Sequence, residues 1–321
     1  MSQKRKLSRR WLAPVITVSV IFVFLSAILI TNIFIPLKYL SAYVNFYADK
    51  PVNGELRISF INVGDGDCTF IELPDGKTVL FDGGNGSYKN QLNIFKKLNS
   101  TGTDKIDYLF CTSSSSKRCG GLAEIVKYKN IGKIFAPLYE NNATSDEYGK
   151  FIKEASRKNI PISRLTYGAG EHNEEYGYCF YVLSAEEALP YSVQDDESFS
   201  AAWISYGGVN ILLFGDMKNS ELGNFYERYT ASGFDIDGHS IKLEECNIVK
   251  VANGGNKTSN NVLLYDLIKA ETAIISTAKE PALALLSDVG IYADSNIYRT
   301  DKNGTVTLNI SGGTYNVKKE R

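Results

Sequence analysis

The side chains most often used for acid–base and metal chemistry are scarce in this chain. Its 321 residues include only two histidines, His172 and His239. Imidazole is the commonest transition-metal ligand and the usual general base near neutral pH. The count therefore argues against a multi-histidine metal site, although it leaves room for a single catalytic histidine. We expect both histidines to lie at the surface or to be hydrogen-bonded locally.

A second group of reactive residue types is the serine run Ser113–Ser116, which is followed directly by Lys117 and Arg118. A serine nucleophile needs a base, and Lys117 would serve only with a strongly lowered pKa. We favour a turn in which the hydroxyls satisfy backbone groups. Because a helix is predicted to begin near 120–122, its N–H groups and the two cations could bind a phosphate, sulfate or carboxylate. The alternative is that both cations are solvated or paired with nearby acids such as Asp82.

The elements that must position these residues alternate between strands and helices. Loop-rich sequence is predicted near 165–177, and a short β meander at 295–317. The two halves of the alternation are joined by no long linker, which favours one mixed α/β domain. Apolar periodicity predicts strands at 56–62, 68–73, 77–82, 106–111, 133–137, 178–183, 201–206, 209–216, 247–251 and 272–276, and helices at 91–98, 121–129, 145–158, 220–229 and 260–268.

The N-terminal segment has the composition of a membrane anchor. Five basic residues and no acid precede residue 11, and no residue from 11 to 36 is charged. About 20 apolar residues cross a bilayer as a helix, and a basic flank stays in the cytoplasm. We therefore predict a cytoplasmic tail at 1–10, a single-pass transmembrane anchor at 11–36, a stalk at 37–54 and an extracytoplasmic domain at 55–321. The rival prediction is a cleaved signal peptide, whose apolar region is shorter, about 7–15 residues.

The composition argues against nonspecific nucleic-acid binding and against a disulfide-rich fold. Six of the 35 basic residues and none of the 36 acidic residues precede residue 41, so the remainder is net acidic. Nonspecific nucleic-acid binding draws on clustered positive charge and is not favoured. A dense disulfide framework is not indicated, and most of the cysteines are expected to be buried as small apolar residues. There are five of them: Cys68, Cys111, Cys119, Cys179 and Cys246.

Six segments resemble, in the same order, motifs of the metallo-β-lactamase-like domain of competence-type (ComEC-type) DNA-uptake proteins. They include Phe-Ile-Asn-Val-Gly-Asp-Gly-Asp at 60–67, Phe-Asp-Gly-Gly at 81–84 and Leu-Phe-Gly-Asp at 213–216. The other three lie at 111–122, 249–256 and 298–304. The resemblance covers about residues 56–317. It implies a four-layer αββα sandwich of the metallo-β-lactamase superfamily.

The resemblance breaks at the metal-binding positions. In active family members, histidines and aspartates hold one or two metal ions, usually zinc, which generate a hydroxide for attack on an ester, amide or phosphodiester. Only Asp216 keeps a ligand-type side chain, whereas a catalytic zinc generally needs three protein ligands and an open position. We therefore predict no metal, no cofactor and no catalytic residue. The residues at the other ligand positions are Ser113, Ser115, Lys117, Arg118, Asn253 and Gly254.

An oxygen-ligand site for Mg²⁺ or Ca²⁺ is an alternative, because the resemblance implies that four aspartates lie near the mouth of one pocket, and carboxylates are ligands of these ions. These are Asp65, Asp67, Asp82 and Asp216. The same aspartates could instead hydrogen-bond loop backbone, or pair with the two loop cations. The vestigial pocket and possible anion site predicted from the sequence thus comprises Asp65, Asp67, Asp82, Ser113, Ser115, Lys117, Arg118, Asp216 and Asn253.

The predicted function is noncatalytic. We expect a membrane-anchored pseudoenzyme that binds an unknown protein or an anionic small molecule outside the cytoplasm. One alternative is a metal-dependent hydrolase acting on DNA or another phosphodiester, as the resemblance implies. The other is a structural or assembly module with its pocket filled by side chains.

Overall fold

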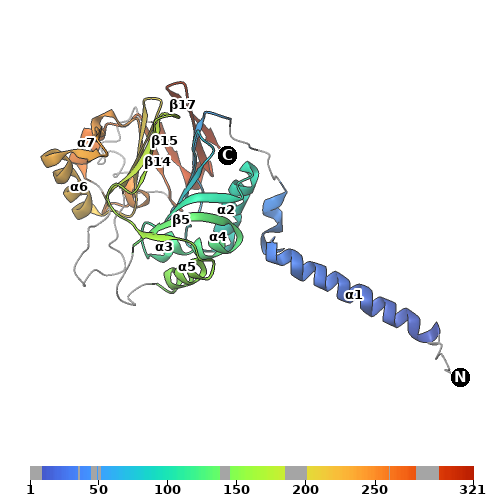
Figure 1. Cartoon of the computed structure of the whole chain (residues 1–321). Helices are drawn as coiled ribbons and strands as arrows, with labels where there is room; N and C mark the ends of the chain where they lie inside the picture. Colours follow the sequence, from blue (N-terminus) through green and yellow to red (C-terminus); the bar gives the residue numbers. More distant parts are fainter. Residues whose placement is uncertain are drawn as a thin grey trace.

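Two large β-sheets face each other in the domain (Figure 1). The computed structural model describes residues 9–34, 37–44, 49, 52–137, 145–184, 201–259, 261–279 and 296–321. The first sheet has the strand order β17-β16-β1-β2-β3-β4-β5-β6 and the second β15-β14-β13-β10-β9-β8-β7. Both sheets mix parallel and antiparallel pairs. Such mixing fits the predicted α/β class.

The strands of the first sheet are β1 (Leu56–Phe60), β2 (Thr69–Glu72), β3 (Thr78–Phe81), β4 (Lys105–Phe110), β5 (Asn130–Ala136), β6 (Ile162–Arg164), β16 (Val306–Ser311) and β17 (Thr314–Lys319). Those of the second are β7 (Gly170–Asn173), β8 (Tyr178–Ser184), β9 (Ala201–Tyr206), β10 (Val209–Phe214), β13 (Ile248–Lys250), β14 (Thr272–Ile275) and β15 (Asn296–Arg299). Strands β1, β2 and β3 are buried along their whole length, as expected when both faces of a sheet are covered.

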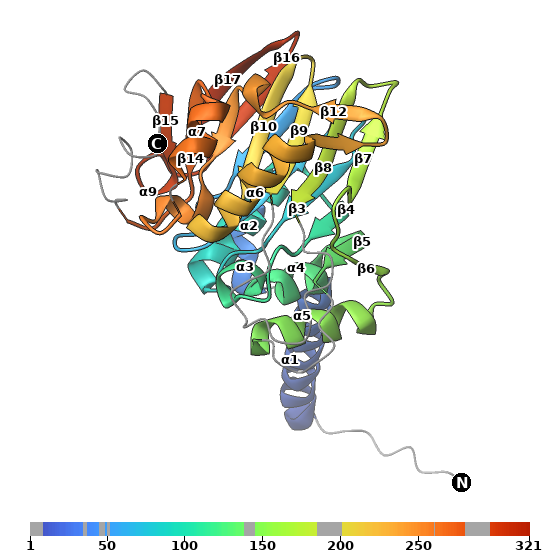
Figure 2. The same ribbon diagram turned by 90° about the vertical axis from the view of Figure 1, so that its left-hand side faces the viewer.

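Helices cover the outer face of each sheet (Figures 1 and 2). The first sheet carries α2 (Tyr88–Thr101), α3 (Ser116–Cys119), α4 (Leu122–Tyr128) and α5 (Asp146–Arg157). The second carries α6 (Asn219–Ser232), α7 (Val262–Ile268) and the hairpin of β11 (Phe234–Ile236) and β12 (His239–Ile241). Short helical turns occur at η2 (Leu243–Glu245), η3 (Ala252–Gly255) and α9 (Thr300–Asn303).

Three apolar cores separate these layers. Ile58, Phe60 and Ile211 belong to the core between the sheets. Leu98 lies in the core beneath α2, α4 and α5, and Phe225 in the core beneath α6 and α7. The arrangement is consistent with the predicted αββα sandwich.

Several segments differ from the sequence prediction, among them strand β6 and the β11–β12 hairpin, which were not predicted. The region 165–177 is not all loop, because β7 forms at its centre and pairs antiparallel with β8. Its sequence, Gly-Glu-His-Asn, has no apolar alternation, so the pattern gave no strand signal. The tail is not a simple meander either, since β15 pairs with β14 in the second sheet. Strands β16 and β17 belong instead to the first sheet.

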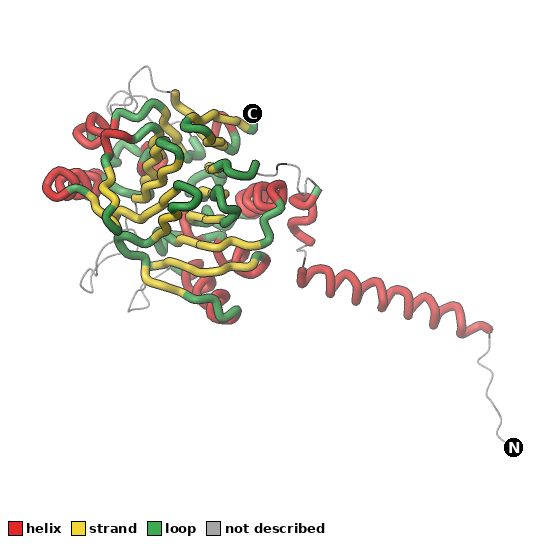
Figure 3. The backbone as a smooth tube through the Cα atoms, turned by 45° about the horizontal axis from the view of Figure 1, so that its top comes forward, coloured by secondary structure: helices red, strands yellow, loops and turns green. Residues whose placement is uncertain are grey.

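Helix α1 (Arg9–Phe34) extends away from the domain (Figures 1 and 3). Its described side chains include the exposed residues Val18, Phe22 and Leu29. Judged on the residues that the structure describes, no helix combines the length and apolarity needed to cross a membrane. The transmembrane helix predicted at 11–36 is therefore not supported by the fold.

Part of the predicted stalk is packed onto the domain. Residues Leu37–Tyr43 form the 3₁₀ segment η1, in which Tyr39 is buried. The Tyr39 ring centroid lies 4.7 Å from that of Phe95 in α2. Asn99 in α2 also donates a hydrogen bond to the Ala42 carbonyl oxygen at 3.2 Å. The segment 37–44 therefore belongs to the folded unit, although it was predicted to be a spacer.

Candidate functional site

The candidate site lies between the two sheets, where several strand ends meet. Asp82 directly follows β3 and Thr112 lies just beyond β4, and these two strands pair in parallel. Asp216 follows β10, and Lys250 is the last residue of the parallel neighbour β13. Because the carboxyl ends of parallel strands meet at one edge, residues distant in sequence converge there. Asp67, just before β2, joins them from the first sheet.

Arg118 lies at the centre of this convergence. Its Nε atom lies 2.7 Å from Oδ2 of Asp216, and its Nη2 contacts the other oxygen of that carboxylate. Its Nη1 contacts the carboxylate of Asp67 and lies 3.6 Å from Oδ2 of Asp82. Only 3% of the Arg118 side chain is exposed. The guanidinium thus makes a bidentate pair with Asp216, which is the strongest geometry available to arginine. It also makes a close ion pair with Asp67 and a longer contact with Asp82.

Lys250 is a second buried cation beside Arg118. Its Nζ atom lies 2.6 Å from Oδ2 of Asp67 and 2.9 Å from the Phe214 carbonyl oxygen. We did not include Lys250 among the predicted site residues, although its segment was part of the resemblance. The position of Lys250 within the apolar strand β13 could have indicated that it is buried beside an acid, because a fully buried lysine almost always has a charged partner.

Asp82 is held by Thr112. The Thr112 backbone N–H donates to Oδ1 at 2.8 Å, and its hydroxyl donates to Oδ2 at 2.6 Å. Burial nevertheless raises the pKa of Asp82 to about 7. This carboxyl therefore changes charge near neutral pH.

The other charged groups of the cluster are shifted in ways that follow from burial and their neighbours. Burial acts to raise the pKa of Asp216, but the Arg118 guanidinium outweighs it, and the net shift is downward. Burial, followed by the positive charge of Arg118, holds the pKa of Lys250 well below its usual value. We call these five groups the charge cluster: Asp67, Asp82, Arg118, Asp216 and Lys250.

The charge cluster leaves almost no free space. The cavity that it lines has a volume of about 20 Å³. That is room for about one water molecule, whereas pockets for small-molecule ligands measure about 300–1,000 Å³. A substrate therefore does not fit beside these side chains in this conformation.

The residues present do not fit a metal ion. Three of the four aspartates of the Mg²⁺ or Ca²⁺ alternative converge, whereas Asp65 is exposed and pairs with Lys117, and the three surround a guanidinium and an ammonium group. Two buried cations would repel a dication at this distance. Within the described residues, no group of three or more histidine, cysteine, aspartate or glutamate side chains could hold a metal.

The serine run has the turn geometry that we favoured. The Ser115 N–H donates to Oγ of Ser113 at 3.0 Å, and Oγ of Ser115 accepts from the Lys117 N–H at 3.4 Å. The Lys117 ammonium lies 3.0 Å from the Asp65 carboxylate at the exposed rim of the loop. Both cations of the predicted anion site are therefore engaged by carboxylates, as in the pairing alternative.

Asn253 lies in a strained loop next to the cluster. Its φ of 47° is left-handed, a region that asparagine tolerates better than most residues. Its side-chain amide donates to Oγ of Ser259 at 3.0 Å, and its backbone N–H donates to the Gly215 carbonyl oxygen at 2.9 Å. The contacts indicate a structural role in positioning η3 beside β10.

The two histidines lie next to each other, on β7 and β12, and neither lines the cavity of the charge cluster. The ring centroids of His172 and His239 are 4.0 Å apart in a T-shaped arrangement. Sequence reasoning treated them separately and did not foresee the contact. The expectation about the cysteines is confirmed: all five lie in the described part of the chain, all are free thiols, and only Cys179 is not fully buried.

No protein-family model matches the chain, and no curated protein sequence is significantly similar to it. Among solved structures, CmlA, a diiron β-hydroxylase from Streptomyces venezuelae, is similar with a TM-score of 0.50 at 12% identity over 81% of this chain. The match covers 55% of CmlA, so this chain spans less than two thirds of its length.

Two further structures carry the fold name. The metallo-β-lactamase-fold protein YhfI from Bacillus subtilis has a TM-score of 0.48 at 8% identity, covering 82% of this chain and all of YhfI. A metallo-β-lactamase from Cronobacter sakazakii has a TM-score of 0.37 at 11% identity, covering 61% of this chain and 77% of that one. At such identities the likeness concerns the fold alone, and the structural neighbours are metallo-β-lactamase-fold proteins.

Proposed function

We propose that this chain is a pseudoenzyme of the metallo-β-lactamase fold, which binds a ligand or partner without metal-dependent catalysis. The observation that carries the proposal is the position of Arg118 among three carboxylates. The guanidinium makes charge-assisted hydrogen bonds with Asp216 and an ion pair with Asp67, it lies 3.6 Å from Asp82, and Lys250 adds a second positive charge. The protein's own cations thus supply the charge compensation that a metal ion supplies in an active member of this superfamily.

Two other functions compete with this proposal. A hydrolase acting on a phosphodiester follows from the resemblance to the competence-type domain, and it needs a metal centre that the donor set does not support. A structural or assembly module is favoured by the filled centre, since a cavity of about 20 Å³ holds no substrate. The module and the pseudoenzyme differ only in whether a ligand binds elsewhere on the domain.

Metal binding distinguishes the pseudoenzyme from the metal-dependent hydrolase. The purified full chain is dialysed against zinc or manganese and then against buffer, and its metal content is measured by mass spectrometry. We expect far less than one ion per chain, and no metal-dependent turnover of a bis-aryl phosphodiester. Near-stoichiometric metal that is lost in Asp216→Ala would overturn the proposal.

We further propose that α1 anchors the domain in a membrane, with the domain outside the cytoplasm. The support is the uncharged sequence at 11–36 beside a basic N-terminus, together with exposed apolar side chains such as Phe22 and Leu29, each 70% exposed. The proposal therefore rests on the sequence at 11–36, since no helix among the described residues is long and apolar enough to span a membrane. The test is extraction of cell membranes: we expect the chain to resist alkaline carbonate and to require detergent, and release by carbonate alone would contradict the anchor.

A further inference from the structure

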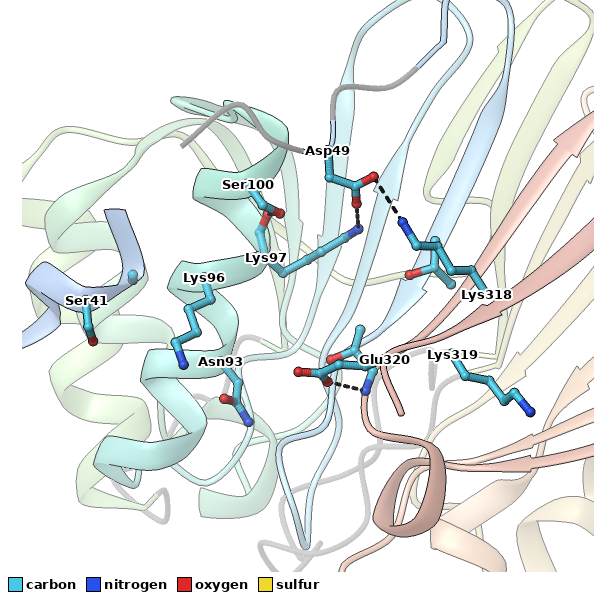
Figure 4. A pocket seen from close by; sticks show the side chains of 12 residues that line it. Ser41, Asp49, Asn93, Lys96, Lys97, Ser100, Lys318, Lys319 and Glu320 are labelled. Carbon is cyan, nitrogen blue, oxygen red and sulfur yellow. Dashed lines mark hydrogen bonds and ion pairs between the residues drawn. The ribbon is translucent and has the colours of Figure 1, made fainter. Parts of the chain in front are cut away.

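A second charged region lies apart from the charge cluster. It is an open groove of about 350 Å³ between η1, α2 and the end of β17 (Figure 4). That volume is within the range of small-molecule sites. Four lysines line it, Lys96 and Lys97 from α2 and Lys318 and Lys319 from β17. We call it the lysine groove. It shares no lining residue with the cavity of the charge cluster.

The two acids in the lysine groove are already engaged. Asp49 has Oδ2 at 3.0 Å from the Lys97 ammonium and Oδ1 at 3.6 Å from that of Lys318 (Figure 4). The side-chain carboxylate of Glu320 accepts a hydrogen bond from the Thr305 backbone N–H at 2.7 Å. These contacts fix the walls of the groove and leave its overall charge positive.

The other two lysines carry the unsatisfied charge. Lys96 and Lys319 are exposed, and neither has an ion-pair partner among the residues that the structure describes. Lys96 lies on α2, together with Asn93 and Ser100, and Lys319 lies on β17 at the opposite margin of the groove (Figure 4). Lysines at both margins of the groove, with the amide of Asn93 and the hydroxyl of Ser100 nearby, favour an extended anion with several acceptor oxygens.

We propose that the lysine groove binds the phosphate of an anionic phospholipid headgroup. A bare phosphate would leave most of a 350 Å³ groove empty, so the size favours an organic phosphate ester. The groove is also lined by Ser41 and Ala42 of η1, which begins only three residues after the end of α1. The choice of a lipid rather than a soluble phosphate ester rests on the proposed anchor, since only an anchored chain holds this groove at a membrane surface.

The test uses the full chain in detergent micelles. Four probes are compared by thermal shift and by calorimetry: inorganic phosphate, sn-glycerol 3-phosphate, dihexanoyl phosphatidylglycerol and dihexanoyl phosphatidylcholine. We expect phosphatidylglycerol to raise the melting temperature and phosphatidylcholine to leave it unchanged. Because screening weakens exposed charge pairs, binding should weaken when the salt concentration is raised to about 0.5 M.

Two double variants make the test specific. Lys96→Ala with Lys319→Ala should lower the affinity for phosphatidylglycerol about tenfold or more, because each substitution removes a charge-assisted contact. The control, Lys89→Ala with Lys257→Ala, removes the same charge from exposed positions outside the groove and should bind as the wild type does. Neither pair contains a residue of the charge cluster.

The outcomes separate the possible ligands. Equal affinity for glycerol 3-phosphate and phosphatidylglycerol would overturn the lipid assignment. No shift with any probe, or equal losses in the two double variants, would overturn the site altogether. The lysine variant should still require detergent for extraction, because the anchor lies at 11–36. Membrane extraction and lipid binding can therefore fail independently of each other.

Discussion

The charge cluster and the lysine groove contain similar numbers of charged side chains but differ in the space around them. In the charge cluster, Arg118 and Lys250 contact carboxylates directly, and the remaining cavity is about 20 Å³. In the lysine groove the space is about 350 Å³, and Lys96 and Lys319 have no ion-pair partner within the described residues. Charge that is compensated internally serves folding, whereas charge that faces open space is available to a ligand. The charge cluster is thus the less suitable of the two regions for binding a ligand.

The largest effect is expected at the centre of the charge cluster. Arg118→Ala leaves Asp67, Asp82 and Asp216 without their main counter-charge in a buried site. Removing one partner of a buried ion pair costs about 3–5 kcal/mol. Urea unfolding should show a loss of this size. The matched control is Lys117→Ala, whose exposed pair is worth less than about 1 kcal/mol. Similar losses in both variants would show that the buried cation is not a structural element.

Lys250→Met tests the second buried cation. We expect a loss of about 2–3 kcal/mol in the free energy of unfolding, because a buried charge-assisted hydrogen bond to Asp67 is removed. The loss should be smaller than that of Arg118→Ala, since Asp67 keeps its contact with Arg118. In a double-mutant cycle with Asp67→Asn, the two effects should not add, and the coupling should be about 1 kcal/mol. Additive losses would mean that the two side chains do not interact.

The pH dependence tests the burial of Asp82. Its folded-state pKa of about 7 lies above the usual value of about 3.9. The folded state therefore binds this proton more tightly than the unfolded state does. The resulting stability is fully present below about pH 4 and is lost as the pH rises through about 7. We expect the wild type to lose about 3 kcal/mol more than Asp82→Asn between pH 5 and pH 8, at about 1.4 kcal/mol for each of the roughly two pH units between 5 and the folded-state pKa. Parallel pH profiles in urea unfolding would contradict the assignment.

The smallest effect on stability is expected in the lysine groove. Lys96→Ala and Lys319→Ala remove exposed lysines without an ion-pair partner among the described residues. Their free energies of unfolding should stay within about 0.5 kcal/mol of the wild type. The variants that affect ligand binding and those that affect stability should therefore fall in different regions. A loss above about 1 kcal/mol in the free energy of unfolding of either groove variant would contradict the prediction that these lysines do not contribute to stability.

Much of the fold could be predicted because its strands are apolar and its motifs keep their order. Strand β1 and helix α5 begin within one residue of their predicted positions, since Leu56 starts a strong alternation and Ser145 is a helix cap. Strand β7 could not be predicted, because its stability comes from pairing with β8 rather than from its own side chains. Likewise, no local pattern predicts that the tail divides between two sheets.

The candidate site was predicted in part. The resemblance predicted that Arg118 and Lys117 stand at positions of metal ligands, but it did not predict their different roles. Both are cations of one loop, yet Arg118 is buried among carboxylates while Lys117 stays at the rim. The direction of a side chain within a four-residue helix depends on the residues that pack around it. Those residues are distant in the sequence, so the loop sequence alone does not predict the direction. Lys250 was missed because its partner, Asp67, is 183 positions away in the chain.

The pairing of β1 with β16 has a consequence for how the chain is made. Strand β1 lies in the interior of the first sheet, between β2 and β16. Strand β16 is much later in the sequence: the hydroxyls of Ser59 and Thr307, which are 248 positions apart, share a hydrogen bond of 3.2 Å. Ribosomes deliver the chain from its N-terminus at about 5–20 residues per second. Strand β1 must therefore wait for more than ten seconds, on the order of the synthesis time of the intervening chain, before its second partner emerges. During that interval the backbone N–H and C=O groups on one edge of β1 are unpaired, so the nascent chain should depend on chaperones or on delayed collapse until β16 and β17 are complete.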